Sequence, residues 1–186
     1  MTTDRKRVLG IVGSPRRGGN TDVLVEEVLV GASEAGALTE KVVLNKLDIH
    51  PCRACEACFK TGRCVQKDDM PALLEKMDQS DVWVLGTPVY WWGPSAQFKT
   101  FLDRWFGQGQ VVGFKGRPVI LTIPLGASDA SFARHIVGMF EGSFAHLEMN
   151  LLATIVVPDV WEVGKVRERP DVLAVARRAG RDAVEK

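Results

Sequence analysis

The cysteines are the residues of this chain whose type and spacing most directly predict chemistry. All four, Cys52, Cys55, Cys58 and Cys64, lie in one short segment, and the first three form two successive Cys-x-x-Cys steps. Such steps can place sulfur atoms around one compact metal centre. The pattern favours a 4Fe–4S cluster held by the four thiolates, although the last cysteine stands farther away than in the usual bacterial run.

Two other interpretations of the cysteines stay open. A zinc site is disfavoured, because four-cysteine zinc sites usually separate two Cys-x-x-Cys pairs by more than the five residues between Cys58 and Cys64. The thiols could instead hold no metal and be reduced or redox-active. Nearby Arg53 and Lys60 are compatible with a cluster, since their positive charge would offset its negative charge.

A second segment could bind an anion. Gly13-Ser14-Pro15-Arg16-Arg17-Gly18-Gly19-Asn20-Thr21 follows an apolar run and precedes an amphipathic pattern. A strand–loop–helix turn of this composition presents N–H groups and hydroxyls, and the helix N-terminus adds partial positive charge. It matches neither the dinucleotide fingerprint nor the Walker loop. A phosphomonoester such as the tail of FMN suits it, and an ordinary capped turn is the alternative.

Three consecutive aromatic residues mark a third segment. Tyr90, Trp91 and Trp92 are framed by proline and glycine just after another apolar run. They are hard to explain as core, and they could cover a flat heteroaromatic ring while loop N–H groups bond its polar edge. Because tyrosine and tryptophan are also favoured at subunit interfaces, an oligomer contact is the second interpretation.

Short β-rich runs alternate with amphipathic patterns along the whole chain. The predicted strands are 8–12, 42–44, 82–85, 118–123 and 152–157, and the predicted helices are 24–32, 68–79, 98–106 behind a cap at Ser95, 131–147 and 171–186. This alternation predicts an α/β, doubly wound, five-stranded parallel sheet with helices on both faces. Strand order 2-1-3-4-5 fits the count and makes the cysteine segment an insert after the second strand, near the carboxyl ends.

Length and charge set further limits. A chain of 186 residues is most simply one domain, 1–186, and its net charge of +1 predicts no nucleic-acid or anionic-membrane partner. No apolar run approaches the roughly 20 residues that span a bilayer. We therefore expect a soluble cytoplasmic protein, where free thiols more often bind metals or carry out redox chemistry than form disulfides.

Three motifs in combination resemble the NADPH-dependent FMN reductase branch of the flavodoxin-like proteins. They are Gly13-Ser14-Pro15-Arg16-x-x-Gly19-Asn20-Thr21, Thr87-Pro88-Val89-Tyr90-Trp91 and Phe98-Lys99-x-Phe101-Leu102-Asp103-Arg104. With the cysteine segment added, the chain is most similar to the iron–sulfur flavoproteins. The motifs cover roughly residues 8 to 106, and beyond them only the alternating strand–helix pattern supports the match.

The resemblance implies a bound FMN near the interface of a homodimer or homotetramer. The residues expected at its phosphate are Ser14, Arg16, Gly19, Asn20 and Thr21. The residues expected at its ring system are Pro88, Val89, Tyr90, Trp91 and Gly93, with Gly126 and Ala127 in a third loop.

We therefore predict an FMN-dependent oxidoreductase that takes hydride from NAD(P)H and passes electrons on through the cluster. FMN would join a two-electron donor to one-electron partners, and no side chain is needed as a catalytic acid or base. Asp68 and Asp69 are accordingly expected to cap a helix. One alternative is an FMN-only NAD(P)H:quinone or flavin reductase without a cluster. The other is a non-enzymatic electron carrier that is reduced by ferredoxin.

Overall fold

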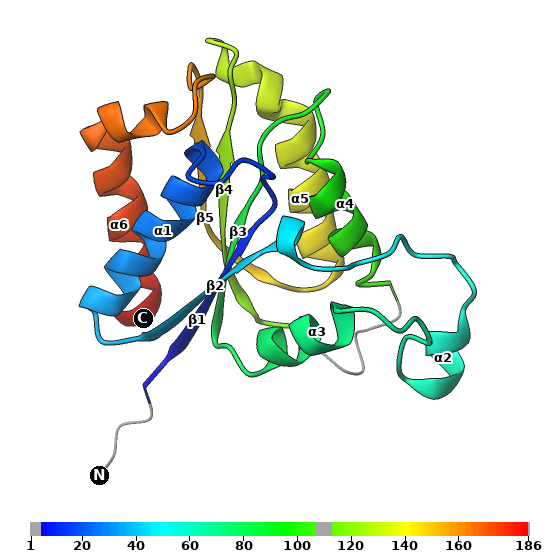
Figure 1. The fold of residues 1–186 in the computed structure, drawn as a ribbon. Coiled ribbons are helices and arrows are strands. Elements are labelled where there is room, and N and C mark those ends of the chain that lie inside the picture. The colour runs from blue at the N-terminus through cyan, green and yellow to red at the C-terminus, as the bar shows by residue number, and fades with distance from the viewer. Residues whose placement is uncertain (1–4, 107–112, 186) are drawn as a thin grey trace.

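A five-stranded parallel sheet forms the centre of the computed structural model, which describes residues 5–106 and 113–185 (Figure 1). The strands are β1 (Arg7–Val12), β2 (Leu38–Val43), β3 (Val82–Gly86), β4 (Pro118–Pro124) and β5 (Asn150–Val157). They lie in the order β2-β1-β3-β4-β5 and every neighbouring pair is parallel. The predicted doubly wound sheet and its strand order are confirmed.

Helices cover both faces of this sheet (Figure 1). They are α1 (Asn20–Glu34), α3 (Met70–Asp78), α4 (Ala96–Asp103), α5 (Arg134–His146) and α6 (Pro170–Glu185), whereas the short α2 (Ala57–Thr61) lies apart from the sheet. One face packs against α1 and α6, and the other packs against α3, α4 and α5. Successive strand residues point to opposite faces, so a strand that is buried on both sides is largely apolar. This property made β1, β3 and β4 recognisable in the sequence.

The strand and helix predictions were least accurate at the edge of the sheet. β2 begins at Leu38 rather than at the predicted residue 42. Its first residues were not predicted because they are exposed and partly charged, so they form no apolar run. The short α2 was missed because it buries no side chain and has no apolar period. The helix predicted at 131–147 is a 3₁₀ turn at Ala130–Ala133 followed by α5.

Helices α1 and α6 cross at unusually short range. A Cβ atom placed on Gly31 would lie 1.8 Å from the carbonyl oxygen of Arg177, and one on Gly180 would lie 1.9 Å from that of Val28. Only glycine fits at these two buried positions. Helix α6 is thereby held against α1, whose first turn follows the segment predicted to bind an anion.

The carboxyl ends of parallel strands meet at one edge of the sheet, so the loops after β1, β3, β4 and β5 are brought together there. The cysteine segment follows β2 as predicted, but it does not join these loops. It forms a separate lobe with α2 and contacts Arg104 and Phe106, at the opposite end of α4 from the aromatic loop (Figure 1). Its expected place near the carboxyl ends is therefore corrected. None of the described helices is long and apolar enough to cross a bilayer.

Candidate functional site

The loop between β1 and α1 is held in a compact shape by hydrogen bonds from its backbone N–H groups. The Ser14 hydroxyl accepts a hydrogen bond from the backbone N–H of Arg16 at 3.2 Å, and Gly19 N–H donates to the Arg16 carbonyl at 3.1 Å. Gly18 adopts φ +66°, which suits glycine, and its N–H donates to the Asp22 carboxylate at 2.9 Å. The loop delivers the chain into α1 at Asn20, and the unpaired N–H groups of a helix's first turn can bind an anion.

The Asp22 carboxylate connects this loop to the edge strand. It lies 2.8 Å from the Lys41 Nζ on β2 as well as accepting the Gly18 N–H. Burial by itself would raise the Asp22 pKa, but the hydrogen bonds from Lys41 and Gly18 outweigh it and hold that pKa below its usual value. Asp22 is therefore ionised at neutral pH and stabilises the loop.

The side chain of Asn20 is fully engaged within the protein. Its amide nitrogen donates to the carbonyls of Val160 at 2.8 Å and Glu162 at 2.9 Å, and its oxygen accepts the Val166 N–H at 3.0 Å. The amide therefore fastens the segment after β5 to the start of α1. Only the backbone N–H of Asn20 remains for a ligand at this position.

The aromatic loop after β3 contains a strained two-residue turn. Tyr90 and Gly93 exchange two backbone hydrogen bonds, at 2.8 and 3.0 Å, across Trp91 and Trp92. Both tryptophans have positive φ, 50° and 61°, which costs non-glycine residues of order 1 kcal/mol each or more. The turn leaves the Trp91 side chain 91% exposed at the rim of the site.

The segment after β5 supplies a wall that the sequence did not reveal. The Trp161 ring lies against Gly126, where a Cβ atom would be 2.4 Å from it. Arg16 Nη1 donates to the Trp161 carbonyl at 3.0 Å, and the guanidinium lies 5.8 Å from the ring centroid. Gly126 therefore allows Trp161 to approach the loop after β4, and Arg16 ties it to the loop after β1.

These loops enclose one open cleft of about 500 Å³, a size typical of small-molecule sites. The residues predicted to contact a flavin line this cleft with three exceptions. Gly19 and Gly93 stand in the two turns that shape it, and Ala127 packs against the core. The lining residues that were not predicted from the sequence are Pro124, Leu125, Val160 and Trp161. Leu125 directly follows β4, and this place at a strand end could have predicted it as a lining residue. Nothing comparable in the sequence marks Val160 and Trp161.

The four cysteines surround a separate and much smaller recess of about 20 Å³. All four are free thiols, and Cys55 is the most exposed of them. Within residues 5–106 and 113–185, no three potential ligand side chains converge closely enough for a single metal ion. Zinc needs four sulfur atoms about 2.3 Å from one point, so the described arrangement is not a formed zinc site.

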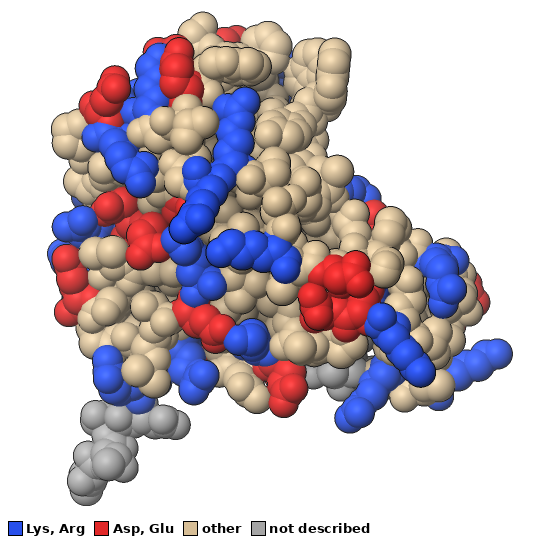
Figure 2. Space-filling model, in the orientation of Figure 1, with Lys and Arg blue, Asp and Glu red and all other residues tan. Residues whose placement is uncertain are grey.

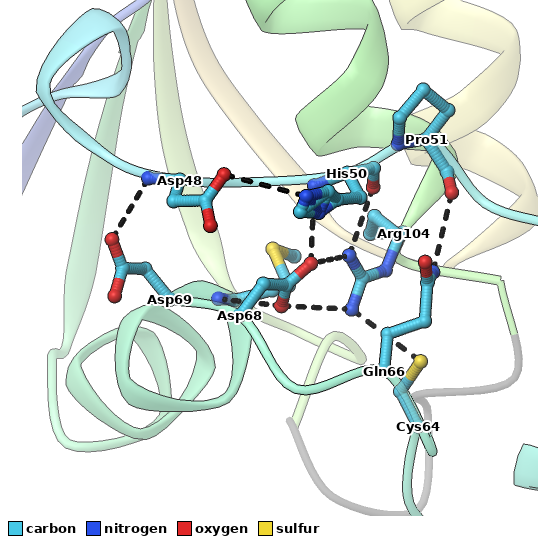
Figure 3. Close-up of polar contacts among 9 residues, drawn as sticks. Asp48, His50, Pro51, Cys64, Gln66, Asp68, Asp69 and Arg104 are labelled. Carbon is cyan, nitrogen blue, oxygen red and sulfur yellow. Dashed lines mark hydrogen bonds and ion pairs between the residues drawn. The ribbon is translucent and has the colours of Figure 1, made fainter.

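Arg104 is one of the residues that line this recess. Figure 3 shows its guanidinium directed at Asp68 and at Cys64. Its guanidinium donates to both carboxylate oxygens of Asp68, and the two side chains are 1% and 0% exposed. Burial alone would raise the Asp68 pKa, but hydrogen bonds from Arg104 and from the backbone hold it below its usual value. The pKa of Arg104 is raised against its own burial by Asp68 and by the nearby Cys64. The pair is therefore ionised at neutral pH.

The structure corrects the expected role of Asp68 and Asp69 as simple helix caps. Asp68 accepts the Met70 N–H at 3.1 Å and so does cap α3, but it is also the partner of Arg104. Asp69 accepts the Asp48 N–H at 2.8 Å instead of capping the helix. His50 lies 3.5 Å from the Asp48 carboxylate and joins this network rather than the thiols.

Comparisons of the sequence with a family model and with known proteins agree on one family. The family model for NADPH-dependent FMN reductase matches residues 6–164. An iron–sulfur flavoprotein of Archaeoglobus fulgidus is 34% identical over 158 residues, covering 85% of this chain and 68% of that protein. One of Methanocaldococcus jannaschii is 44% identical over 98 residues, 53% of this chain and 51% of that protein, so this match spans about half of the relative's length.

A solved structure supports the fold as well. An NAD(P)H:quinone oxidoreductase from Methanothermobacter marburgensis superposes with a TM-score of 0.77 over 96% of this chain and 98% of that chain, at 17% identity. At that identity the likeness concerns the arrangement of strands and helices alone.

Proposed function

Because the chain belongs to the NADPH-dependent FMN reductase family, we propose that it is an NAD(P)H-dependent FMN oxidoreductase that binds its flavin in the cleft at the carboxyl edge of the sheet. One observation carries the proposal. Residues of three separate loops, each predicted to contact phosphate or ring, line one cleft. Asn20 and Thr21, in the first turn of α1, also line this cleft. An anionic group and a flat ring system can therefore be bound there together.

The residues divide by what part of FMN they would hold. The phosphate would accept hydrogen bonds from the first N–H groups of α1, from the hydroxyls of Ser14 and Thr21, and from Arg16. The ring system would lie between the 88–91 segment and the loop of Gly126, with Trp161 as a wall. FMN, when bound, supplies the hydride and electron chemistry, and these residues orient it and exclude water from it. We assign no catalytic acid or base.

Titration of the metal-free protein with FMN and riboflavin tests the site. We expect FMN to bind more tightly, because riboflavin lacks the phosphate. Equal affinity would contradict the phosphate assignment. Rapid mixing of the loaded protein with NADH and NADPH tests the activity, and absence of flavin bleaching with both would exclude the reductase.

We further propose that Cys52, Cys55, Cys58 and Cys64 hold a 4Fe–4S cluster. The four thiols line one recess, which is the donor set that such a cluster requires, and the relatives in two archaea are named iron–sulfur flavoproteins. Anaerobic purification followed by iron and sulfide analysis tests this. Cys55→Ala should lose iron and keep FMN, since the cysteine recess and the cleft share no lining residue. A yellow protein without iron would leave an FMN-only reductase.

A second candidate function is electron transfer to or from another protein. Basic side chains gather over the lobe that carries α2, where Arg53, Lys60, Arg63 and Lys67 are exposed around the thiols and Glu56 is the one acid in that segment (Figure 2). Exposed Phe59 and Val65 add an apolar centre. Small, charged contacts of this kind suit a transient redox partner with an acidic surface, such as a ferredoxin. Reduction by a ferredoxin that slows steeply with added salt would support it, and no reduction would exclude it.

Two exposed aromatic side chains outside the cleft lining, Trp92 and Phe132, support the expected homodimer or homotetramer. Trp92 stacks on Phe132 with ring centroids 6.1 Å apart, and both are about two-fifths exposed. A second copy of the chain would cover them, since aromatic residues are enriched at subunit contacts. Sedimentation of the FMN-loaded protein measures this directly, and a monomer at micromolar concentration would contradict it.

A further inference from the structure

The buried ion pair of Arg104 and Asp68 closes the base of the cysteine segment, together with a hydrogen bond from the Gln66 amide to the Pro51 carbonyl at 3.2 Å. His50 precedes the segment and Asp68 follows it, and the His50 N–H donates to the Asp68 carboxylate at 3.1 Å. Arg104 donates to the His50 carbonyl at 2.9 Å while also holding Asp68 (Figure 3). One guanidinium from the end of α4 therefore joins both ends of a segment that is otherwise largely exposed.

The same guanidinium reaches a thiol. Arg104 Nη2 lies 3.4 Å from the Cys64 Sγ, within the range of an N–H to sulfur hydrogen bond. The orientation of Arg104 is fixed, because a buried charge that turned away from Asp68 would lose its compensation. The fork geometry of a guanidinium lets it serve the carboxylate, the carbonyl and the sulfur together. Cys64 thus faces a positively charged donor of fixed direction.

A second thiol is attached to the same end of α4. The Cys58 Sγ donates to the Phe106 carbonyl at 3.7 Å, and the Phe59 and Phe106 rings meet edge to face at 5.1 Å. Cys58 and Cys64 are therefore both positioned by residues just after the C-terminal end of α4. In contrast, the exposed Cys55 has no such contact among the described residues.

We propose that Arg104, held by Asp68, is a positioning residue for the metal centre: it fixes the direction of Cys64 and sets the potential of the bound cluster. The second part rests on the cluster proposed above. A reduced cluster carries one more negative charge than an oxidised one, so a cationic donor at a ligating sulfur stabilises the reduced form more. Arg104 therefore raises the cluster's potential and favours its retention by preorganising Cys64.

The test compares Arg104→Met, Arg104→Lys and Asp68→Asn with Lys99→Met. Lys99 lies on the same helix and pairs with Asp103 at the surface, so its variant removes the same charge without touching the cysteine segment. Three quantities are measured on the full chain: iron and sulfide per protein after anaerobic reconstitution, the cluster midpoint potential, and amide hydrogen exchange over residues 51–67 in metal-free protein. FMN content serves as the control for the rest of the fold.

We expect Arg104→Met to lose most of its iron, to shift the residual cluster to a more negative potential, and to exchange about tenfold faster over 51–67, as loss of a charged hydrogen bond implies. Arg104→Lys should show smaller changes in iron content, potential and exchange than Arg104→Met. It keeps the positive charge but loses the forked N–H donors of the guanidinium. Asp68→Asn should follow Arg104→Met in iron and exchange, and it remains informative if the Met variant does not fold.

Equal iron, potential and exchange in Arg104→Met and Lys99→Met would overturn the proposal. A purely structural role would speed exchange and lower iron without moving the potential relative to Lys99→Met, and this result would overturn the electrostatic part. If the unaltered protein binds no iron, the proposed cluster itself is wrong. The positioning role is then decided by hydrogen exchange in the metal-free variants alone.

Discussion

Arg16 and Trp161 are joined across the mouth of the proposed flavin cleft although they are 145 positions apart in the sequence. The Arg16 Nη1 donates to the Trp161 carbonyl at 3.0 Å, and the guanidinium lies 5.8 Å from the indole centroid. Among the described residues that line the cleft, Arg16 is the one cation, and its guanidinium is oriented by Trp161 of the segment after β5. The cleft is therefore formed jointly by the loop after β1 and the segment after β5, which are far apart in the sequence.

Replacing Arg16 with leucine should weaken FMN binding about 10- to 100-fold, because a charge-assisted hydrogen bond to phosphate is worth about 1.5–3 kcal/mol. Riboflavin affinity should change much less, since it has no phosphate. Fluorescence titration with both flavins measures the two constants. The control is Arg17→Leu, which alters an exposed neighbour that does not line the cleft. Equal losses for both flavins would place Arg16 away from the phosphate.

Replacing Asn20 with alanine should lower the free energy of unfolding by roughly 2–3 kcal/mol. The change leaves the buried carbonyl of Val160 and the N–H of Val166 without their partners. It should also weaken FMN binding, because the segment carrying Trp161 loses its attachment to α1. Urea unfolding of the metal-free protein gives the stability, and Asn45→Ala is the exposed control. An unchanged midpoint would show that water replaces the amide.

Gly180→Ala should destabilise the protein by about 1–3 kcal/mol, the usual cost of overpacking, because the new methyl group would lie 1.9 Å from the Val28 carbonyl oxygen. Helix propensity alone predicts the opposite sign, a gain of up to about 1 kcal/mol. Gly142→Ala is the matched control: it lies in α5, is exposed, and has open space at its Cβ, so it should stabilise. Thermal or urea unfolding decides, and a stabilised Gly180→Ala would mean that α6 can move away from α1.

The Asp22 carboxylate should make stability depend on acid pH. Its folded-state pKa lies below the ordinary 3.8, despite burial and because of Lys41 and Gly18, so its contribution is complete above pH 3.8. That contribution is lost as pH falls through the folded-state pKa. Asp22→Asn should therefore cost about 1 kcal/mol at pH 6 and progressively less towards pH 3. Unfolding free energies of both proteins over this range measure it, and a pH-independent difference would contradict the assignment.

The sequence predicted the sheet well because most of its strands are buried on both faces. Val82–Gly86 is buried throughout, and an apolar run of that length bounded by turn residues is typical of an interior parallel strand. The start of β2 was predicted too late in the chain. An edge strand buries little of its surface, so it needs few apolar residues and is hard to recognise. The short α2 gave no period to detect, and its lobe is organised by contacts to the end of α4 rather than by its own sequence.

The sequence by itself determined which chemistry is present: a glycine-rich turn before a helix, three aromatics after a strand, and four closely spaced thiols. These depend on residue type and short spacing, which local backbone preferences translate directly into loops at strand ends. Only the tertiary structure decided how each group is used. The Asn20 amide is committed to residues 160–166, and Arg104 holds Cys64 from forty positions away. Such pairings arise from the docking of whole helices and strands, and no local pattern in the chain encodes them.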